Sequence, residues 1–269
     1  MKRKSLHKTL IQLLNTVKNQ RLIPLLLPLL YFMPIVPTMA ESYDQDFNGF
    51  PNGTTELGDG SVITGQAASI VDGRLQLTQD GEALGFSSFS VPAISGSSQG
   101  FTITFDYELY DGPGSNDPAD GFSLNYGNAP MGDPGQAEEG MVGRPGVTEN
   151  LSFEVDTWRN GDSEQGVNIS GIVNGADIDQ LAFENGIILN DGQRIQGSIE
   201  MTWDPGTGAS FTTTGMNTNA NFTGIDTAGF NPNDEHTFII SARVGGANQD
   251  LFIDNLIIST ETNEPVRNG

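Results

Sequence analysis

Hydrophobic and polar residues alternate in short segments throughout the chain after residue 40, and clusters of Gly, Asn, Asp and Pro separate these segments. Such alternation places successive side chains on opposite faces of a β-strand. In Phe101–Leu109 the odd-numbered residues are apolar or aromatic, and the even-numbered ones are Thr, Asp and Glu. Ile195–Asp204 follows the same rule, with Trp203 on the apolar side. Both segments predict strands with one face in the core and one in water.

Other segments with the same character bring the expectation to about ten strands. No stretch after residue 40 has the length and periodicity of an amphipathic helix, so the predicted fold class is all-β, with two stacked antiparallel sheets. We expect one domain over residues 41–260 and a short C-terminal tail at 261–269. The further predicted strands are Arg74–Thr78, Ala83–Val91, Gly121–Tyr126, Leu151–Trp158, Val167–Val173, Ser210–Thr214, His236–Arg243 and Leu251–Ile258.

Residues 1–40 have the pattern of a signal peptide. Six Lys and Arg residues precede an apolar run at Leu22–Val36, and small residues before Glu41 predict cleavage after Ala40. The alternative is a retained membrane anchor, but the run of about fifteen residues is shorter than the roughly twenty that a spanning helix needs. We therefore expect bacterial export and a secreted, extracellular protein, with no membrane insertion of the mature chain.

Removal of that segment makes the charge more extreme. Six arginines and no lysine remain against thirty-four Asp and Glu residues, which gives a net charge of −28. Nucleic acid is therefore an unsuitable partner, whereas cations and neutral sugars are compatible with this charge. The absence of cysteine excludes disulfides, so the core or a bound metal has to stabilise the extracellular fold. The sequence indicates no particular oligomeric state.

The residues that could bind a ligand lie in Leu151–Trp158 and around two long polar loops, Asp111–Ala119 and Gly127–Asn150. We expect the binding site at these loops. Alternation places Leu151, Phe153 and Val155 on the core face, and the opposite face carries two carboxylates and an indole. Oxygen donors along this face and the next loop suit a hard cation such as Ca²⁺. The alternative is a solvated acidic strand face. The candidate donors are Glu154, Asp156, Asn160, Asp162 and Glu164.

Several segments, in order, resemble the L-type lectins, the concanavalin-like family of legume and cargo-receptor lectins. The similarity spans most of the mature chain. It implies a concanavalin A-like jelly-roll β-sandwich that binds carbohydrate and contains Ca²⁺. The matching segments are Asp72–Thr78, Asn116–Phe122 with its Pro-Ala-Asp-Gly-Phe pattern, Glu154–Asn160 with its Glu-x-Asp-Thr-aromatic-x-Asn pattern, and Ser241–Asn248 with its Ser-Ala-x-x-Gly loop.

The resemblance also implies roles for individual residues. Asp120 would accept hydrogen bonds from sugar hydroxyls, after a cis peptide bond to Ala119. Trp158 would stack on a sugar ring while its carbonyl binds calcium, and Asn160 would contact both calcium and sugar. The implied metal ligands are Glu154 and Asp156, with Asp162 or Glu164 as a further acidic ligand. The implied sugar-binding glycines are Gly140 as a backbone donor, with Gly143 and Gly146 as alternatives, and Gly246 in the segment with the Ser-Ala-x-x-Gly loop.

The sequence departs from the family at the histidine that binds a transition metal, whose place falls near Asn168. The one histidine after residue 40, His236, lies far along the chain, where a strand-end or surface position is expected, so a second metal ion is doubtful. Trp158 also stands where laminarinase-like hydrolases have a second catalytic glutamate, which argues against an enzyme. The remaining alternative is an extracellular structural or adhesion module without sugar affinity.

Overall fold

The computed structural model describes residues 41–81, 84–112, 118–158, 165–227 and 229–260, which belong to one compact unit. The predicted signal peptide and C-terminal tail lie outside these residues. The described chain forms fifteen strands and one short 3₁₀ turn, η1 (Ala137–Glu139). The strands are β1 (Ser42–Gln45), β2 (Val62–Thr64), β3 (Ser69–Val71), β4 (Arg74–Thr78), β5 (Gly85–Val91), β6 (Phe101–Tyr110), β7 (Gly121–Gly127), β8 (Asn150–Asp156), β9 (Gly166–Val173), β10 (Ala176–Asn185), β11 (Arg194–Asp204), β12 (Gly208–Thr213), β13 (Asn221–Ile225), β14 (Thr237–Val244) and β15 (Asp250–Thr260).

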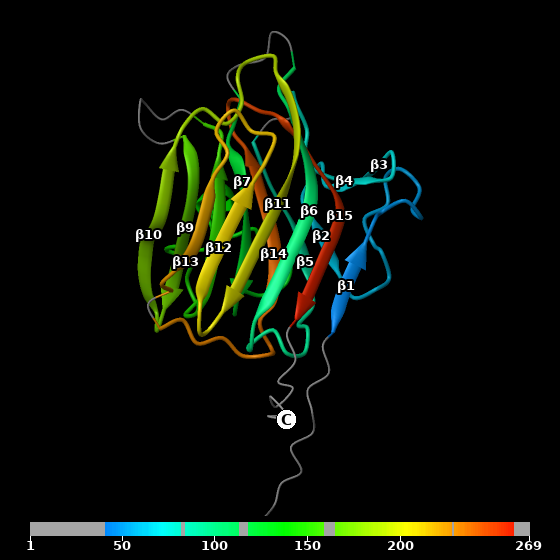
Figure 1. The fold of residues 1–269 in the computed structure, drawn as a ribbon. Coiled ribbons are helices and arrows are strands. Elements are labelled where there is room, and N and C mark those ends of the chain that lie inside the picture. The colour runs from blue at the N-terminus through cyan, green and yellow to red at the C-terminus, as the bar shows by residue number, and fades with distance from the viewer. Residues whose placement is uncertain (1–40, 82–83, 113–117, 159–164, 228, 261–269) are drawn as a thin grey trace, which may run out of the picture. The chain divides into compact units, whose positions relative to one another are not determined.

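The strands form two antiparallel sheets, stacked face to face (Figure 1). Sheet A has eight strands in the order β13-β12-β11-β6-β15-β4-β3, with β1 paired to β15 outside this path. Sheet B has seven strands in the order β10-β9-β8-β7-β14-β5-β2. This architecture confirms the predicted all-β jelly-roll sandwich.

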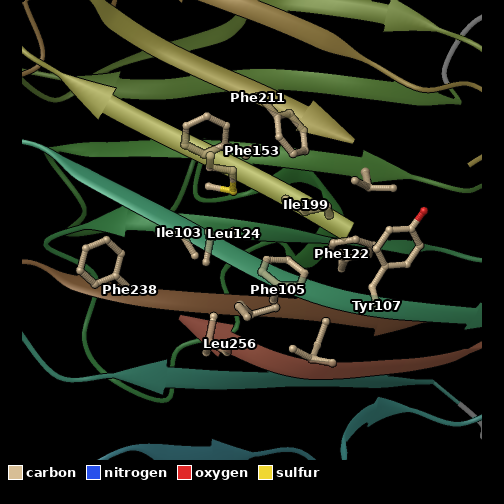
Figure 2. Packing of buried hydrophobic residues seen from close by; sticks show 14 of the residues in the cluster. Ile103, Phe105, Tyr107, Phe122, Leu124, Phe153, Ile199, Phe211, Phe238 and Leu256 are labelled. Atoms are coloured by element: carbon tan, nitrogen blue, oxygen red, sulfur yellow. The ribbon is translucent and has the colours of Figure 1, made fainter. Parts of the chain in front are cut away.

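The core lies between the sheets and consists of the side chains that the alternation assigned to it (Figure 2). Aromatic pairs connect the layers: the ring centroids of Phe153 in β8 and Phe211 in β12 are 5.4 Å apart, and those of Phe105 in β6 and Phe122 in β7 are 6.5 Å apart. Trp203 is buried, as predicted. Edge-on packing of large rings contributes dispersion energy in addition to the hydrophobic effect.

All ten predicted strands are present, with ends that differ by a few residues. The structure adds five: β1, β2, β3, β10 and β13. Each of the five lies at or beside a sheet edge. One prediction about sheet A was wrong, because Glu108 belongs to the face expected in water but is only 4% exposed. Arg74, 3.2 Å away, and Arg194 cover its carboxylate and neutralise it.

The outer face of sheet B is polar and positions the candidate site. Cross-strand pairing aligns a row of residues across this face, one residue from each of β5, β14, β7, β8 and β9. A second row lies beside the first, displaced by two residues along each strand. The segment between β7 and β8, including η1, packs on this face: Ala137 O accepts from Ser123, and Gly132 N donates to Ser90 Oγ over 2.8 Å. The first row is Phe86, Arg243, Gly121, Asp156 and Gly166; the second is Ser88, Ser241, Ser123, Glu154 and Asn168.

Neither η1 nor any other described segment is a helix long and apolar enough to cross a membrane. His236 immediately precedes β14, in agreement with the predicted strand-end position. Its imidazole is buried rather than on the surface, 5.7 Å from the ring of Tyr126, and burial lowers the pKa of His236. The imidazole therefore packs as part of the protein interior, and this position gives no support to His236 as a metal ligand.

Candidate functional site

The candidate site lies at the end of sheet B where β7 begins and β8 ends. The Ala119–Asp120 peptide bond is cis, as the sequence resemblance implied. The backbone of Asp120 connects two neighbouring segments: its N–H donates to Arg243 O over 3.0 Å, and its carbonyl accepts from Thr157 N over 2.9 Å and Trp158 N over 3.3 Å. Segments that are far apart in sequence are therefore fixed against one another at Asp120.

The Asp120 carboxylate forms an ion pair with Arg243 and lies close to Gly245. Arg243 Nε donates to its Oδ2 over 2.9 Å, and a Cβ at Gly245 would lie 2.9 Å from the same oxygen. The Asp120 side chain is only 9% exposed, so little of it is in contact with solvent. Asp120 thus has a fixed orientation, with the small Gly245 permitting the close approach of the chain.

Arg243 and Glu138 are parts of this site that the sequence did not reveal. The Arg243 guanidinium forms a second ion pair, with Glu138 Oε1 from η1. Burial raises the pKa of Glu138 to about 8, although the charge of Arg243 acts in the opposite direction. Arg243 could have been noticed as one of only six cations after residue 40, whereas Glu138 lies in an irregular loop without any local signal.

Glu154 lies in the second row of sheet B and is almost fully buried. Asn168 Nδ2 donates to its Oε2 over 2.6 Å, and Ser170 Oγ donates to its Oε1. Burial raises the pKa of Glu154 to about 8, against the effect of these two donors. Asn168, the position that resemblance assigned to a metal-binding histidine, is therefore a neutral hydrogen-bond partner of Glu154.

Asp156 and Trp158 lie where β8 gives way to the following loop. The strand ends at Asp156, two residues earlier than predicted. The Asp156 side chain is half-buried and its Oδ1 accepts from Trp158 N over 2.8 Å. Trp158 is partly exposed. The backbone of Trp158 is therefore adjacent to Asp120, because its N–H also lies 3.3 Å from Asp120 O.

The two glycines with predicted sugar contacts differ in their surroundings. Gly140 is buried, its N–H donates to Ala137 O over 3.0 Å, and a Cβ there would lie 2.3 Å from Ser152 Oγ. That amide is engaged, so the glycine serves close packing in this conformation. Gly246 is exposed with open space around it. Asn160, Asp162 and Glu164 lie outside the described residues.

A calcium site can be tested against the described donors. They include no group of three or more His, Asp or Glu side chains arranged around a common point. Asp156 fits a hard cation, because it is a half-buried carboxylate at the end of β8 and carboxylate oxygens are the ligands that such ions take. Glu154 does not fit in the same way, because both of its oxygens already accept hydrogen bonds from neutral groups.

The two sheets and their strand order define the chain as a jelly-roll sandwich of the legume-lectin type. No protein-family model matches the chain, and no curated protein matches it. Peanut lectin bound to a peptide is similar with a TM-score of 0.61 and 19% identity, over 84% of this chain and 99% of the lectin.

Two further solved structures extend the comparison. Basic winged bean lectin with Tn-antigen has a TM-score of 0.61 at 15% identity and covers 84% of this chain and 100% of its own. The exoplasmic/lumenal domain of VIP36 in a Ca²⁺- and Man-bound form has a TM-score of 0.59 at 15% identity, covering 81% and 88%. At such identities the similarity shows that this chain has the lectin fold.

Proposed function

We propose that this chain is a secreted lectin that binds a neutral glycan, with the help of calcium, at the end of sheet B. The observation that carries the proposal is the pair of backbone hydrogen bonds from Thr157 N and Trp158 N to Asp120 O, which join the partly exposed Trp158 to the residue whose carboxylate Arg243 orients. A carboxylate accepts hydrogen bonds from sugar hydroxyls, and a flat indole packs against the C–H face of a sugar ring.

The charges of the site favour a neutral ligand over an anionic one. Arg243 is the cation that contacts Asp120, and Glu138 also binds it, so two carboxylates balance one guanidinium. An added anion would therefore meet no unpaired positive charge at Arg243. The winged bean lectin with Tn-antigen and the Man-bound VIP36 domain support the choice of a sugar, because both have this fold.

Calcium would be held by Asp156, the carbonyl of Trp158, Asn160 and one of Asp162 and Glu164. When bound, the ion would neutralise the carboxylates that coordinate it. Glu154 would act indirectly, because it connects β8, which carries Asp156, to β9 through Asn168 and Ser170.

Glycoside hydrolysis is not favoured. A retaining hydrolase needs two carboxyl groups about 5–5.5 Å apart, one of which can attack the sugar. Glu154 is buried with both oxygens engaged, and the residue four positions on is Trp158. The remaining alternative, a structural or adhesion module without sugar affinity, is an outcome of the experiment below.

The experiment is a glycan array probed with the mature protein, once with calcium and once with chelator. We expect hits with calcium and their loss with chelator. Asp120→Asn keeps the size of the side chain but removes its charge, so binding should fall roughly 10- to 100-fold. Asp44→Asn, at an exposed position of β1, is the matched control and should bind normally. An array without hits for the unsubstituted protein would identify a structural module.

A further inference from the structure

Phe86 is an aromatic residue that the fold leaves in contact with solvent beside the candidate site. It is 46% exposed, although it lies inside strand β5. The other outward positions of β5, Ser88 and Ser90, are fully buried, and Gly132 N donates to Ser90 Oγ. The segment between β7 and β8 thus contacts the outer face of β5 at Ser90, whereas Phe86 remains accessible.

The register places this ring next to the residues that hold Asp120. Phe86 is the cross-strand partner of Arg243, and its ring centroid lies 5.6 Å from Arg243 Cζ. Arg243 Nε, one covalent bond from Cζ, donates to Asp120 Oδ2 over 2.9 Å. Arg243 therefore connects the exposed ring directly to the carboxylate. The ring and the carboxylate lie close enough for adjacent sugars of one glycan to contact both.

Arg243 also determines which ligands suit this surface. Its guanidinium is bound by Asp120 and Glu138, so it offers no unbalanced positive charge to an acidic sugar. The Arg243 guanidinium lies over the Phe86 ring, where a cation–π contact holds the ring. The exposed part of Phe86 remains open to apolar contact. A neutral sugar with an exposed C–H face satisfies these conditions.

We infer that Phe86 forms a second subsite, which binds the neighbouring sugar of a neutral oligosaccharide whose first sugar contacts Asp120 and Trp158. The inference rests on the proposed function and specifies its ligand class: the protein binds an oligosaccharide more tightly than the corresponding monosaccharide. Phe86 supplies stacking area in this subsite, and Arg243 holds the two subsites at a fixed separation.

The test compares two sets of probes by calorimetry in calcium buffer: the methyl glycosides of mannose, galactose and glucose, and linear neutral trisaccharides of the same sugars. Phe86→Ala should weaken trisaccharide binding about 2- to 10-fold, the range expected for loss of one aromatic contact. Its monosaccharide affinity should stay unchanged. Phe86→Tyr keeps the ring and should retain trisaccharide affinity. Ile257→Ala, at an exposed position of β15 in the other sheet, is the control.

Each other outcome has a definite meaning. If Phe86→Ala weakens neither probe, or weakens both equally, the second subsite does not exist, while the binding that remains still supports the proposed lectin function. If the unsubstituted protein binds none of the probes, the proposed function fails and the subsite fails with it. Melting temperatures of the variants confirm that each one is folded.

Discussion

The environment of Glu154 in the structure differs from the one that its position in the sequence suggests. In the sequence it is an acid on the polar side of a strand, either solvated or bound to metal. In the structure it is 6% exposed and its oxygens accept from Asn168 and Ser170, which are both neutral. Hydrogen bonds from neutral groups compensate only partly for the loss of water around a charge, so the protonated form gains stability.

This environment predicts that stability depends on pH. Burial raises the pKa of Glu154 from 4.5 to about 8, so the folded protein binds a proton that the unfolded chain has already released between these values. The stabilising contribution is complete below pH 4.5 and disappears as pH rises through about 8. In the presence of chelator, Glu154→Gln should make the decline in unfolding free energy over this range shallower by up to about 1.4 kcal/mol per pH unit.

Denaturant unfolding at several pH values measures this slope. Glu200→Gln, at an exposed position of β11, is the matched control and should leave the slope as it is. Glu138, whose pKa burial also raises to about 8, would maintain part of the slope in the Glu154 variant. A Glu154 variant with the same pH dependence as the unsubstituted protein would contradict the assigned environment.

At the scale of elements, the ten predicted strands differ physically from the five that sequence patterns did not reveal. The predicted strands each contribute a regular set of buried side chains to the core, so apolar residues recur with a period of two. β10 runs at the edge of sheet B and alternates mainly between exposed and half-buried positions. Its pairing with β9 comes from backbone hydrogen bonds, which leave no hydrophobic pattern in the sequence.

The pairing of β7 with β8 depends on Gly121. Its φ is +135°, and a Cβ there would lie 2.1 Å from Val155 O, which is a backbone atom of the neighbouring strand. Gly121→Ala should therefore separate the two strands next to Asp120, lower the unfolding free energy by roughly 3 kcal/mol or more, and weaken glycan binding.

Gly143 supplies the control for this prediction. Its φ is +73°, but no atom lies within 4 Å of a Cβ built there. Gly143→Ala should cost about 1 kcal/mol, which reflects only the unfavourable backbone conformation. Thermal or denaturant unfolding of both variants compares the two effects. Equal destabilisation would show that the close approach at Gly121 is relieved by a small shift of the strands.

At the scale of the whole molecule, the dominant property is negative charge on a sandwich that has no disulfides. The carboxylates around Asp156 repel one another, and Arg243 is the cation that the described residues place among them. We expect calcium to stabilise the fold. A concentration of one hundred times Kd contributes about 2.7 kcal/mol, which corresponds to a rise in Tm of roughly 5–10 °C for a domain of this size.

Thermal unfolding after dialysis against chelator, then with added calcium, tests this expectation. Magnesium at the same concentration is the control, since it loses its bound water reluctantly and fits an irregular oxygen site less well. Magnesium should therefore raise Tm less than calcium does. Identical Tm values in all three conditions would exclude a structural calcium site.

The sequence by itself determined the fold class, the ten strands that build the core and the position of Asp120 within a segment that resembles the L-type lectins. These features follow from local patterns, because alternation and short motifs are properties of neighbouring residues. Only the tertiary structure decided the partners of the polar residues. Arg243, Glu138 and Phe86 come from separate segments. Pairing of β5, β14 and β7 brings Phe86 and Arg243 to Asp120, and packing of η1 on sheet B brings Glu138 there. Burial and ion pairing depend on such long-range contacts, which no local pattern specifies.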